Sequence, residues 1–369
     1  MARSDDGRNR QAVLNAFAKQ IGWCEGLGSP FTARLLTVLA DDIAAGGINA
    51  ELVRAWPGDP IADALALRMA GALHALVLTE TAPALVACYP PRAATIEQLR
   101  SIVPPVVEEH RNHIQTFLSS APQTNEVGRS GVLVGGFLQI AEETGLPLRL
   151  LEVGASAGLN AVWDRYHYQF GDADWGDRQS AVRIAPHWEG QLPPLDAPVQ
   201  VFERFACDMT PVELEDPAQR LRLRAYVWAD QRERLSRLES AIGLARVYGP
   251  RVDRADAADR VKVKLQEPVK ASATVLYHSI MWQYLAAQTR ADIRTSLQRA
   301  GHLATDAAPL AWLRFEPSDS ESWPELRLTL WPGAKETCLA VAHPHGSNVR
   351  WSGSSSRCSA SPDALLQGR

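Results

Sequence analysis

Two patterns of hydrophobic residues divide the chain near residue 125. Up to about residue 120, apolar residues recur at three- and four-residue spacing, which is typical of amphipathic helices. Ser29 before Pro30 predicts a capped helix start with proline at the first helical position, and Gly46 predicts its end. We therefore expect a helical N-terminal domain over residues 1–125.

Beyond residue 130, short apolar runs alternate with helical stretches. This alternation predicts a mainly parallel sheet with right-handed crossovers. The last two runs are separated by a few residues around Gly333, which predicts an antiparallel hairpin. We expect one long helix over residues 217–245, an inserted β-hairpin in residues 166–190, and a disordered Ser/Gly-rich tail over residues 352–369. The strand-and-helix domain would then span residues 126–351.

Composition narrows the class of protein. Apolar residues make up 46% of the chain, enough for a sizeable core, and the net charge of −4 leaves no basic region to follow a nucleic acid backbone. The five cysteines are odd in number and never spaced C-x-x-C, which predicts reduced thiols. The polar N-terminus and the absence of a run of about 20 apolar residues argue against secretion and a membrane span. We expect a cytoplasmic protein with a small-molecule partner and leave its oligomeric state open.

The stretch "LRLLEVGASAGLN", residues 148–160, carries glycine, serine and glycine at positions 154, 156 and 158. One interpretation is a hydrolase in which Ser156 is a nucleophile on a strand-to-helix turn. Asp256 or Glu316 would be its acid, and His343 or His345 its base. The helical region before residue 130 argues against this, because an α/β-hydrolase places several strands before its nucleophile.

A second interpretation is a cofactor-binding turn. With Glu152 the stretch reads E-x-G-x-S-x-G, which resembles the first motif of class I S-adenosylmethionine-dependent methyltransferases. The resemblance implies an α/β, Rossmann-like, seven-stranded methyltransferase-type sheet that binds S-adenosylmethionine. Glu152 would order the turn, and the start of the following helix would face the ligand. The cofactor would lie against four positions: Gly154, Ser156, Gly158 and Asn160.

Further positions match the same resemblance. Asp208 ends the second strand, where such proteins bind ribose hydroxyls. The pair Asp256 and Ala257 resembles the acid and small residue that read the adenine amino group. Arg129 would meet the methionine carboxylate, with Asn125 and Glu126 shaping the pocket. The alternative for this last group is a helix cap, Thr124 or Asn125, beside a surface arginine.

His278 and Ser279 end the fourth strand, at the edge where open α/β sheets bind ligands, and both are candidate catalytic residues. His278 is a candidate general base at the methyl acceptor, and the alternative is a core histidine bonded to backbone. Trp282 and Tyr284 are candidates for a substrate-pocket wall, or for core packing.

His343 and His345 have the H-x-H spacing of a metal pair, but no third ligand is evident, so no metal is expected.

Several segments across the chain together resemble an uncharacterised bacterial family, domain-of-unknown-function family twenty-three thirty-two. They are "QTNEVGR", "LEVGASAGLN", "VWADQRERLSRL", "LYHSIMWQYL" and "AHPHGSNVRW". The resemblance implies a methyltransferase-type fold and brings no established reaction. Our leading expectation is methyl transfer to an unknown small or medium-sized acceptor. A serine hydrolase and a non-catalytic nucleoside-binding protein stay open as alternatives.

Overall fold

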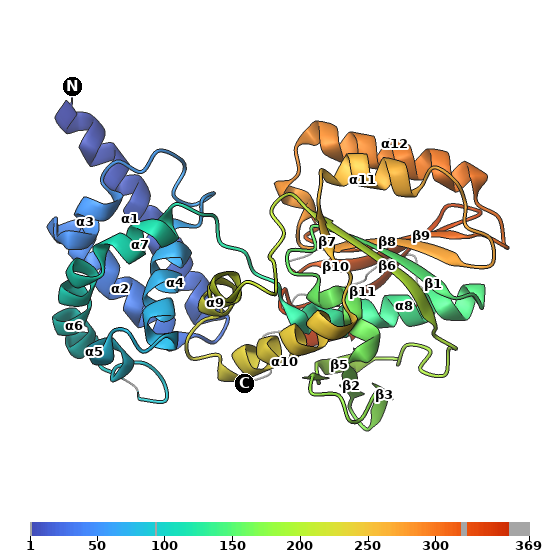
Figure 1. Ribbon diagram of the computed structural model, residues 1–369, viewed down its shortest axis with the longest axis horizontal. Helices are drawn as coiled ribbons and strands as arrows, with labels where there is room; N and C mark the ends of the chain where they lie inside the picture. The colour runs from blue at the N-terminus through green and yellow to red at the C-terminus, as the bar shows by residue number, and fades with distance from the viewer. Residues whose placement is uncertain (1, 93, 319–322, 354–369) are drawn as a thin grey trace. The chain divides into compact units, whose positions relative to one another are not determined.

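A computed structural model describes residues 2–92, 94–318 and 323–353 (Figure 1). The chain divides into two compact units. The helical unit comprises Met1–Thr124 and Asp216–Ser236, and the sheet unit comprises Asn125–Glu215 and Arg237–Arg369. Residues 216–236 thus group with the N-terminal helices, although the sequence pattern assigned them to the sheet domain. Of the tail expected to be disordered, residues 354–369 lie outside the described part of the chain.

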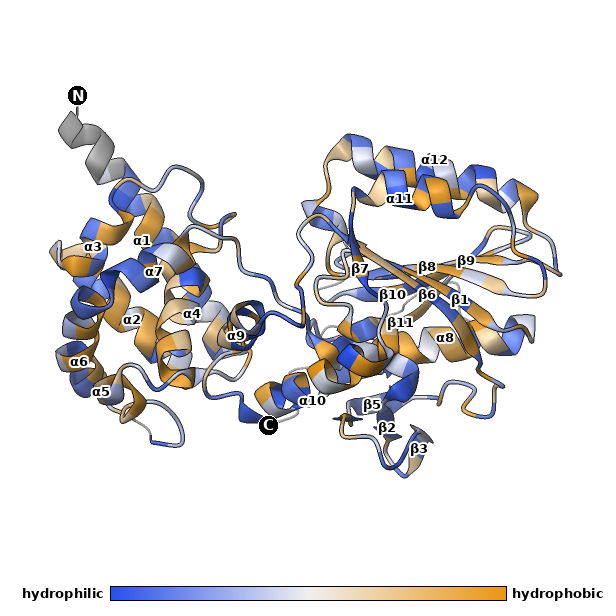
Figure 2. Cartoon of the chain, in the orientation of Figure 1, coloured by the Kyte–Doolittle hydropathy of each residue, from blue (hydrophilic) through white to orange (hydrophobic). Residues whose placement is uncertain are grey.

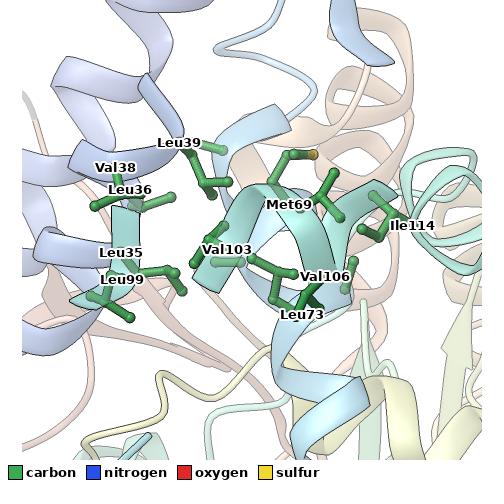
Figure 3. Packing of buried hydrophobic residues seen from close by; sticks show 14 of the residues in the cluster. Leu35, Leu36, Val38, Leu39, Met69, Leu73, Leu99, Val103, Val106 and Ile114 are labelled. Atoms are coloured by element: carbon green, nitrogen blue, oxygen red, sulfur yellow. The ribbon is translucent and has the colours of Figure 1, made fainter. Parts of the chain in front are cut away.

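The helical unit has helices up to residue 118, as the apolar spacing predicts, and it also contains α9 from the later segment. They are α1 (Ala2–Gly26), α2 (Pro30–Ala45), α3 (Ile48–Val53), α4 (Leu65–Leu78), α5 (Pro83–Val86), α6 (Ile96–Glu109), α7 (Arg111–Leu118) and α9 (Pro217–Ala225). Leu35 of α2, Leu73 of α4 and Val103 of α6 are fully buried and pack in one cluster (Figure 3). The core of this unit therefore lies where α2, α4 and α6 meet.

The start of α2 is capped by a residue distant in sequence. The Ser29 side chain makes no cap hydrogen bond to the helix backbone. Instead the Phe31 backbone N–H donates to Asp230 Oδ2 at 2.8 Å, and the Ser29 hydroxyl donates to the same carboxylate. Asp230 lies between α9 and α10 (Arg232–Tyr248), where we expected one unbroken helix over 217–245. The break allows Asp230 to satisfy a backbone donor that a helix start otherwise leaves unpaired.

In the described part of the chain, the large sheet has nine strands rather than seven, in the order β5-β12-β11-β10-β9-β8-β1-β6-β7. Across the sheet, the neighbouring strands β7, β6, β1, β8 and β9 are parallel to one another. The neighbouring strands β9, β10, β11 and β12 are antiparallel. The predicted hairpin is confirmed as β10 and β11. The strands are β1 (Leu148–Val153), β5 (His187–Gly190), β6 (Val201–Asp208), β7 (Val252–Arg254), β8 (Ala273–Ser279), β9 (Leu310–Glu316), β10 (Glu325–Trp331), β11 (Lys335–Ala342) and β12 (Asn348–Trp351).

The inserted segment forms more than the predicted hairpin. β2 (His167–Phe170) and β3 (Ala173–Gly176) pair as expected, and β4 (Arg183–Ile184) joins them in a small three-stranded sheet. β5, at the end of the same segment, instead pairs with β12 at the edge of the large sheet. The two additional strands β5 and β12 explain why the sheet is wider than the seven strands expected.

Helices cover both faces of the large sheet. α8 (Ser130–Thr144) lies on one face, with α11 (Ala257–Lys264) and α12 (Ala287–Leu303) on the other (Figure 1). Leu151 and Val153 of β1 pack in one cluster with residues of α11 and α12. The central strands are largely apolar, as expected for strands buried on both faces (Figure 2).

Strand order reverses direction between β1 and β8. From β1 the chain proceeds through β6 to β7 on one side, and then returns to β8 and β9 on the other. Ligands of open α/β sheets bind outside the carboxyl ends of the strands at such a reversal. The segments that follow β1, β6 and β8 therefore form the natural place to look for a site.

Cys24, Cys88 and Cys207 are free, buried thiols, as the sequence predicts. Cys338 departs from that expectation, because its sulfur takes part in a disulfide. Along the described residues, no helix combines the length and apolar character that crossing a bilayer requires.

Candidate ligand-binding site

The turn after β1 needs its small residues. Gly154, Ser156 and Gly158 have φ values of +68°, +53° and +71°, in the left-handed region that favours glycine. A Cβ on Gly154 would lie 2.8 Å from side-chain atoms of Met281, and one on Gly158 would lie 3.0 Å from Val252. Backbone conformation and close neighbours thus both account for the two glycines.

The helix expected after this turn does not form. Residues Leu159–Arg165 form a 3₁₀ segment, η2, with a kink at Val162. Side chains bind the N–H groups of the turn instead. Asn125 Oδ1 accepts from Ala157 N at 3.3 Å and from Leu159 N at 3.1 Å. The dipole of an α-helix therefore does not point at this turn. Hydrogen bonds to side chains hold the turn instead.

Asp208, at the end of β6, holds the same turn from the neighbouring strand. Its Oδ2 accepts from Ser156 N at 2.9 Å, and its Oδ1 accepts from Thr210 N at 2.9 Å. The residue is half-buried. Each carboxylate oxygen has two lone pairs, so Asp208 keeps capacity to accept further hydrogen bonds. Its expected contact with ribose hydroxyls stays a prediction.

The segment before α8 lies directly on the turn. Asn160 Nδ2 donates to the backbone oxygen of Glu126 at 3.3 Å. The Glu126 side chain accepts from Gly128 N at 2.9 Å and so caps the short 3₁₀ segment η1 (Val127–Arg129). The structure thus brings Asn125, Glu126 and Asn160 together, and the cap of η1 is Glu126 rather than the expected Thr124 or Asn125.

Glu152 is buried at the centre of the sheet, 4% exposed. Tyr277 lies opposite it on β8 and donates its hydroxyl to Glu152 Oε2 at 3.1 Å. Burial raises the pKa of Glu152 to about 8; the Tyr277 hydrogen bond opposes this rise, and the charge of Asp208 adds to it. The Glu152 side chain is therefore hydrogen-bonded to Tyr277 on the neighbouring strand. At neutral pH its carboxyl is mainly protonated.

Ser156 is 8% exposed, and its hydroxyl has no hydrogen-bond partner among the described residues. A serine nucleophile requires a base within hydrogen-bond reach. Of the two acids proposed for the hydrolase, Glu316 pairs with His278 rather than with His343 or His345, and Asp256 caps α11 (Ala257–Lys264). Among the described residues, the parts of a hydrolase triad do not come together around Ser156.

Asp256 begins α11. Its Oδ1 accepts from Ala258 N at 2.8 Å and from Asp259 N at 3.2 Å, which is the geometry of an N-cap. Ala257 is the first residue of the helix and is buried. The pair lies at the carboxyl end of β7, and capping accounts for the acid whether or not it also reads adenine.

Arg129 joins two segments that are distant in sequence. Its Nε donates to the backbone oxygen of Pro344 at 3.1 Å, and its Nη1 donates to the backbone oxygen of Ser279 at 3.2 Å. Beside it, a Cβ on Gly346 would lie 2.2 Å from the backbone oxygen of Gly128. Arg129 thus acts as a clamp between backbone segments at this edge, and its expected contact with a carboxylate stays a prediction.

His278 is 1% exposed, and both of its ring nitrogens are engaged. Nδ1 lies 2.6 Å from Glu316 Oε1, and the indole Nε1–H of Trp312 donates to Nε2 at 3.1 Å. Because an indole nitrogen only donates, Nε2 must accept and Nδ1 must carry the proton. In this arrangement no lone pair is left to take a proton from a substrate. The geometry favours a core histidine, held by side chains rather than by backbone.

Trp282 and Tyr284 form the short 3₁₀ segment η3 (Trp282–Tyr284) and lie in different surroundings. The Trp282 ring stacks on His278, with centroids 5.0 Å apart and planes 11° apart, and Arg294 lies 5.3 Å from its centroid. Tyr284 is 76% exposed. Trp282 therefore has the packing role given as the alternative, and Tyr284 is available to a solvent-borne partner.

The two late histidines contact each other. His343 Nδ1 accepts from the backbone N–H of His345 at 3.1 Å, and their ring centroids are 5.3 Å apart. The residues that the structure describes contain no group of three or more side chains placed to hold a metal ion.

Sequence reasoning missed two residues at this edge. Glu316 was considered only as a hydrolase acid, whereas it binds His278 and the backbone N–H groups of Met281 and Trp282. Met281 was not considered at all, although it packs on Gly154. An acid ending an apolar strand is the one local signal that could have pointed to Glu316.

A comparison with known protein families identifies a match over most of the chain. The family model described as "Uncharacterized protein conserved in bacteria (DUF2332)" matches residues 14–351. No curated protein and no solved structure matches the chain.

Proposed function

The chain belongs to this family of uncharacterised bacterial proteins, and we propose that its sheet unit is a Rossmann-like, methyltransferase-type domain. On this proposal, S-adenosylmethionine binds at the carboxyl edge of the sheet, beside the Gly154–Gly158 turn. Its methyl group is transferred to a small or medium-sized acceptor. Neither a nucleic acid nor a membrane is part of the proposal.

One observation carries the proposal. The Gly154–Gly158 turn ends β1 at the reversal of strand order, and the side chain that closes the next parallel strand, Asp208, bonds to its backbone. Numbered along the chain, the parallel strands β7, β6, β1, β8 and β9 follow the order 3-2-1-4-5. That is the order of dinucleotide-binding sheets, in which the ligand lies at the same turn.

The groups at the turn suit a ligand with hydroxyls. Ser156 presents a buried hydroxyl without a partner among the described residues, and a ligand acceptor would remove the cost of leaving it unpaired. Asp208 has lone pairs left to accept from vicinal hydroxyls. When bound, the sulfonium compound supplies an already activated methyl group. The chain's task is then to bind, orient and exclude water, and positioning supplies most of the rate.

The engagement of His278 favours a second candidate, a nucleoside-binding protein without catalysis. With both ring nitrogens bonded, His278 offers no base to an acceptor. Methyl transfer stays a candidate, because an acceptor that is already deprotonated needs no base. The two candidates share the ligand and differ in whether the protein turns it over.

Calorimetric titration with S-adenosylmethionine and S-adenosylhomocysteine tests the shared part. Asp208→Asn should weaken binding by about tenfold, the effect of losing one hydrogen bond to a charged group. Asp216→Asn is the matched control, because Asp216 caps α9 in the helical unit and should leave affinity unchanged. No heat at millimolar ligand would end both candidates. Binding without product from any supplied acceptor would favour the non-catalytic one.

A further inference from the structure

The carboxyl edge contains an anchor that links the end of β9 to the Gly154–Gly158 turn. Glu316 is the last residue of β9 and is 8% exposed. Its Oε1 accepts from Met281 N at 3.1 Å, and its Oε2 accepts from Met281 N and Trp282 N at 3.2 Å each. With His278 Nδ1 at 2.6 Å, the carboxylate binds three separate donors from residues 278–282.

The backbone that Glu316 holds is strained. Ile280 has φ +48°, a value that a β-branched residue rarely adopts. Strain of this kind persists only where surrounding contacts impose it. The backbone hydrogen bonds to Glu316 begin at Met281, the residue after Ile280. Ile280 N itself donates at 2.8 Å to the backbone oxygen of Phe315, which directly precedes Glu316 on β9. The end of β9 therefore fixes the turn that follows β8.

The turn so fixed directs one side chain onto the ligand site. Atoms Cβ, Cγ and Cε of Met281 lie 2.8–3.0 Å from the point that a Cβ on Gly154 would occupy. Met281 is therefore in direct contact with the first glycine of the β1 turn. Any ligand that approaches this glycine must also meet the Met281 side chain.

We propose that Glu316 is a positioning residue of the ligand site, which holds Met281 against Gly154 so that the Met281 side chain borders the bound ligand. His278 completes the anchor by fixing the Glu316 carboxylate, and this gives the histidine a role without proton transfer. The identity of the ligand in this inference rests on the proposed function. The position of Met281 does not depend on the proposed function.

The first test measures the position of Met281 without any ligand. In the full chain treated with hydrogen peroxide, peptide mass spectrometry follows oxidation of Met281, with Met209 as internal standard because Met209 is 61% exposed. Glu316→Gln replaces an acceptor oxygen with an amide donor that cannot bind a backbone N–H. We expect Met281 to oxidise several-fold faster relative to Met209 in this variant.

Glu325→Gln is the matched control. Glu325 lies opposite Glu316 in the β9–β10 register, is 3% exposed and pairs with Arg327 at 2.6 Å. A loss of stability without repositioning should appear in both variants, but only Glu316→Gln should change Met281 oxidation. Equal acceleration in both folded variants, or none in Glu316→Gln, overturns the inference.

The second test measures the affinity for S-adenosylhomocysteine. Glu316→Gln should lower it about tenfold, and Glu325→Gln should leave it within a factor of about three. In a double-mutant cycle, adding Glu316→Gln to Met281→Ala should lower affinity no further, since Glu316 acts through Met281. Additive losses overturn the positioning role. A wild-type protein that binds no ligand ends the proposed function, and Met281 oxidation then decides the role of Glu316 by itself.

Discussion

Glu152 and Tyr277 face each other across β1 and β8, and the tyrosine hydroxyl donates to the buried carboxyl at 3.1 Å. Glu152 lies two residues before Gly154, the first residue of the Gly154–Gly158 turn. Burial makes the charged form of Glu152 unfavourable and raises its pKa from 4.5 to about 8. This one relationship makes the stability of the sheet unit dependent on pH.

The first prediction concerns that dependence. Between pH 4.5 and 8 the folded chain keeps a proton on Glu152 that the unfolded chain has lost. Stability should therefore fall as pH rises through this window, by at most about 1.4 kcal/mol per pH unit, and level off above pH 8. Glu152→Gln cannot ionise, so the free energy of unfolding of wild type minus that of this variant isolates the effect. Urea unfolding at several pH values measures it.

Tyr277→Phe provides the matched variant. The Tyr277 hydrogen bond lowers the pKa of Glu152, so its loss should raise that pKa further and move the end of the decline above pH 8. A wild-type to Glu152→Gln difference that stays constant from pH 5 to pH 8 would contradict the assignment of a raised pKa.

The second prediction concerns the contact between Gly128 and Gly346. Gly346 has φ +72°, and a Cβ there would lie 2.2 Å from the backbone oxygen of Gly128. Gly346→Ala should therefore cost at least about 2 kcal/mol, from left-handed strain and from the clash. Gly243→Ala is the control, because Gly243 lies inside α10 with nothing within 4 Å of its added Cβ. That change should stabilise by up to about 1 kcal/mol. Equal unfolding midpoints for the two variants would refute the close approach.

Local patterns predicted the parts of this fold that depend on local sequence. The apolar run of β1 and the hairpin of β10 and β11 could be identified because each is set by neighbouring residues. The glycine spacing located the turn after β1. The 3₁₀ segment after it was missed, because Asn125 binds Leu159 N at the start of that segment and Asp208 binds Ser156 N in the turn before it.

Contacts between distant residues were beyond such reasoning. Asp230 caps α2 across 199 positions, so the cap was assigned to the nearby Ser29. His278 has the residue type and strand-end position of a base. Its partners Glu316 and Trp312 come from the next strand, however, and only pairing of β8 with β9 reveals that they engage both nitrogens. Candidate chemistry could thus be located by sequence, but its hydrogen bonds could not.

The last prediction tests that engagement. Trp312 Nε1–H donates to His278 Nε2, so neutral His278 should exist as the tautomer with its proton on Nδ1. Trp312→Phe removes the indole donor and leaves a ring. The hydrogen bond to Glu316 should preserve the same tautomer, while unfolding becomes easier by about 1–3 kcal/mol because a buried acceptor loses its partner. Nitrogen-15 NMR of histidine-labelled protein reads the tautomer directly. Trp188→Phe is the control, since its Nε1–H donates to an exposed backbone oxygen and should have little effect on stability. A proton found on Nε2 in the wild type would show that His278 is arranged otherwise, and the case for it as a base would reopen.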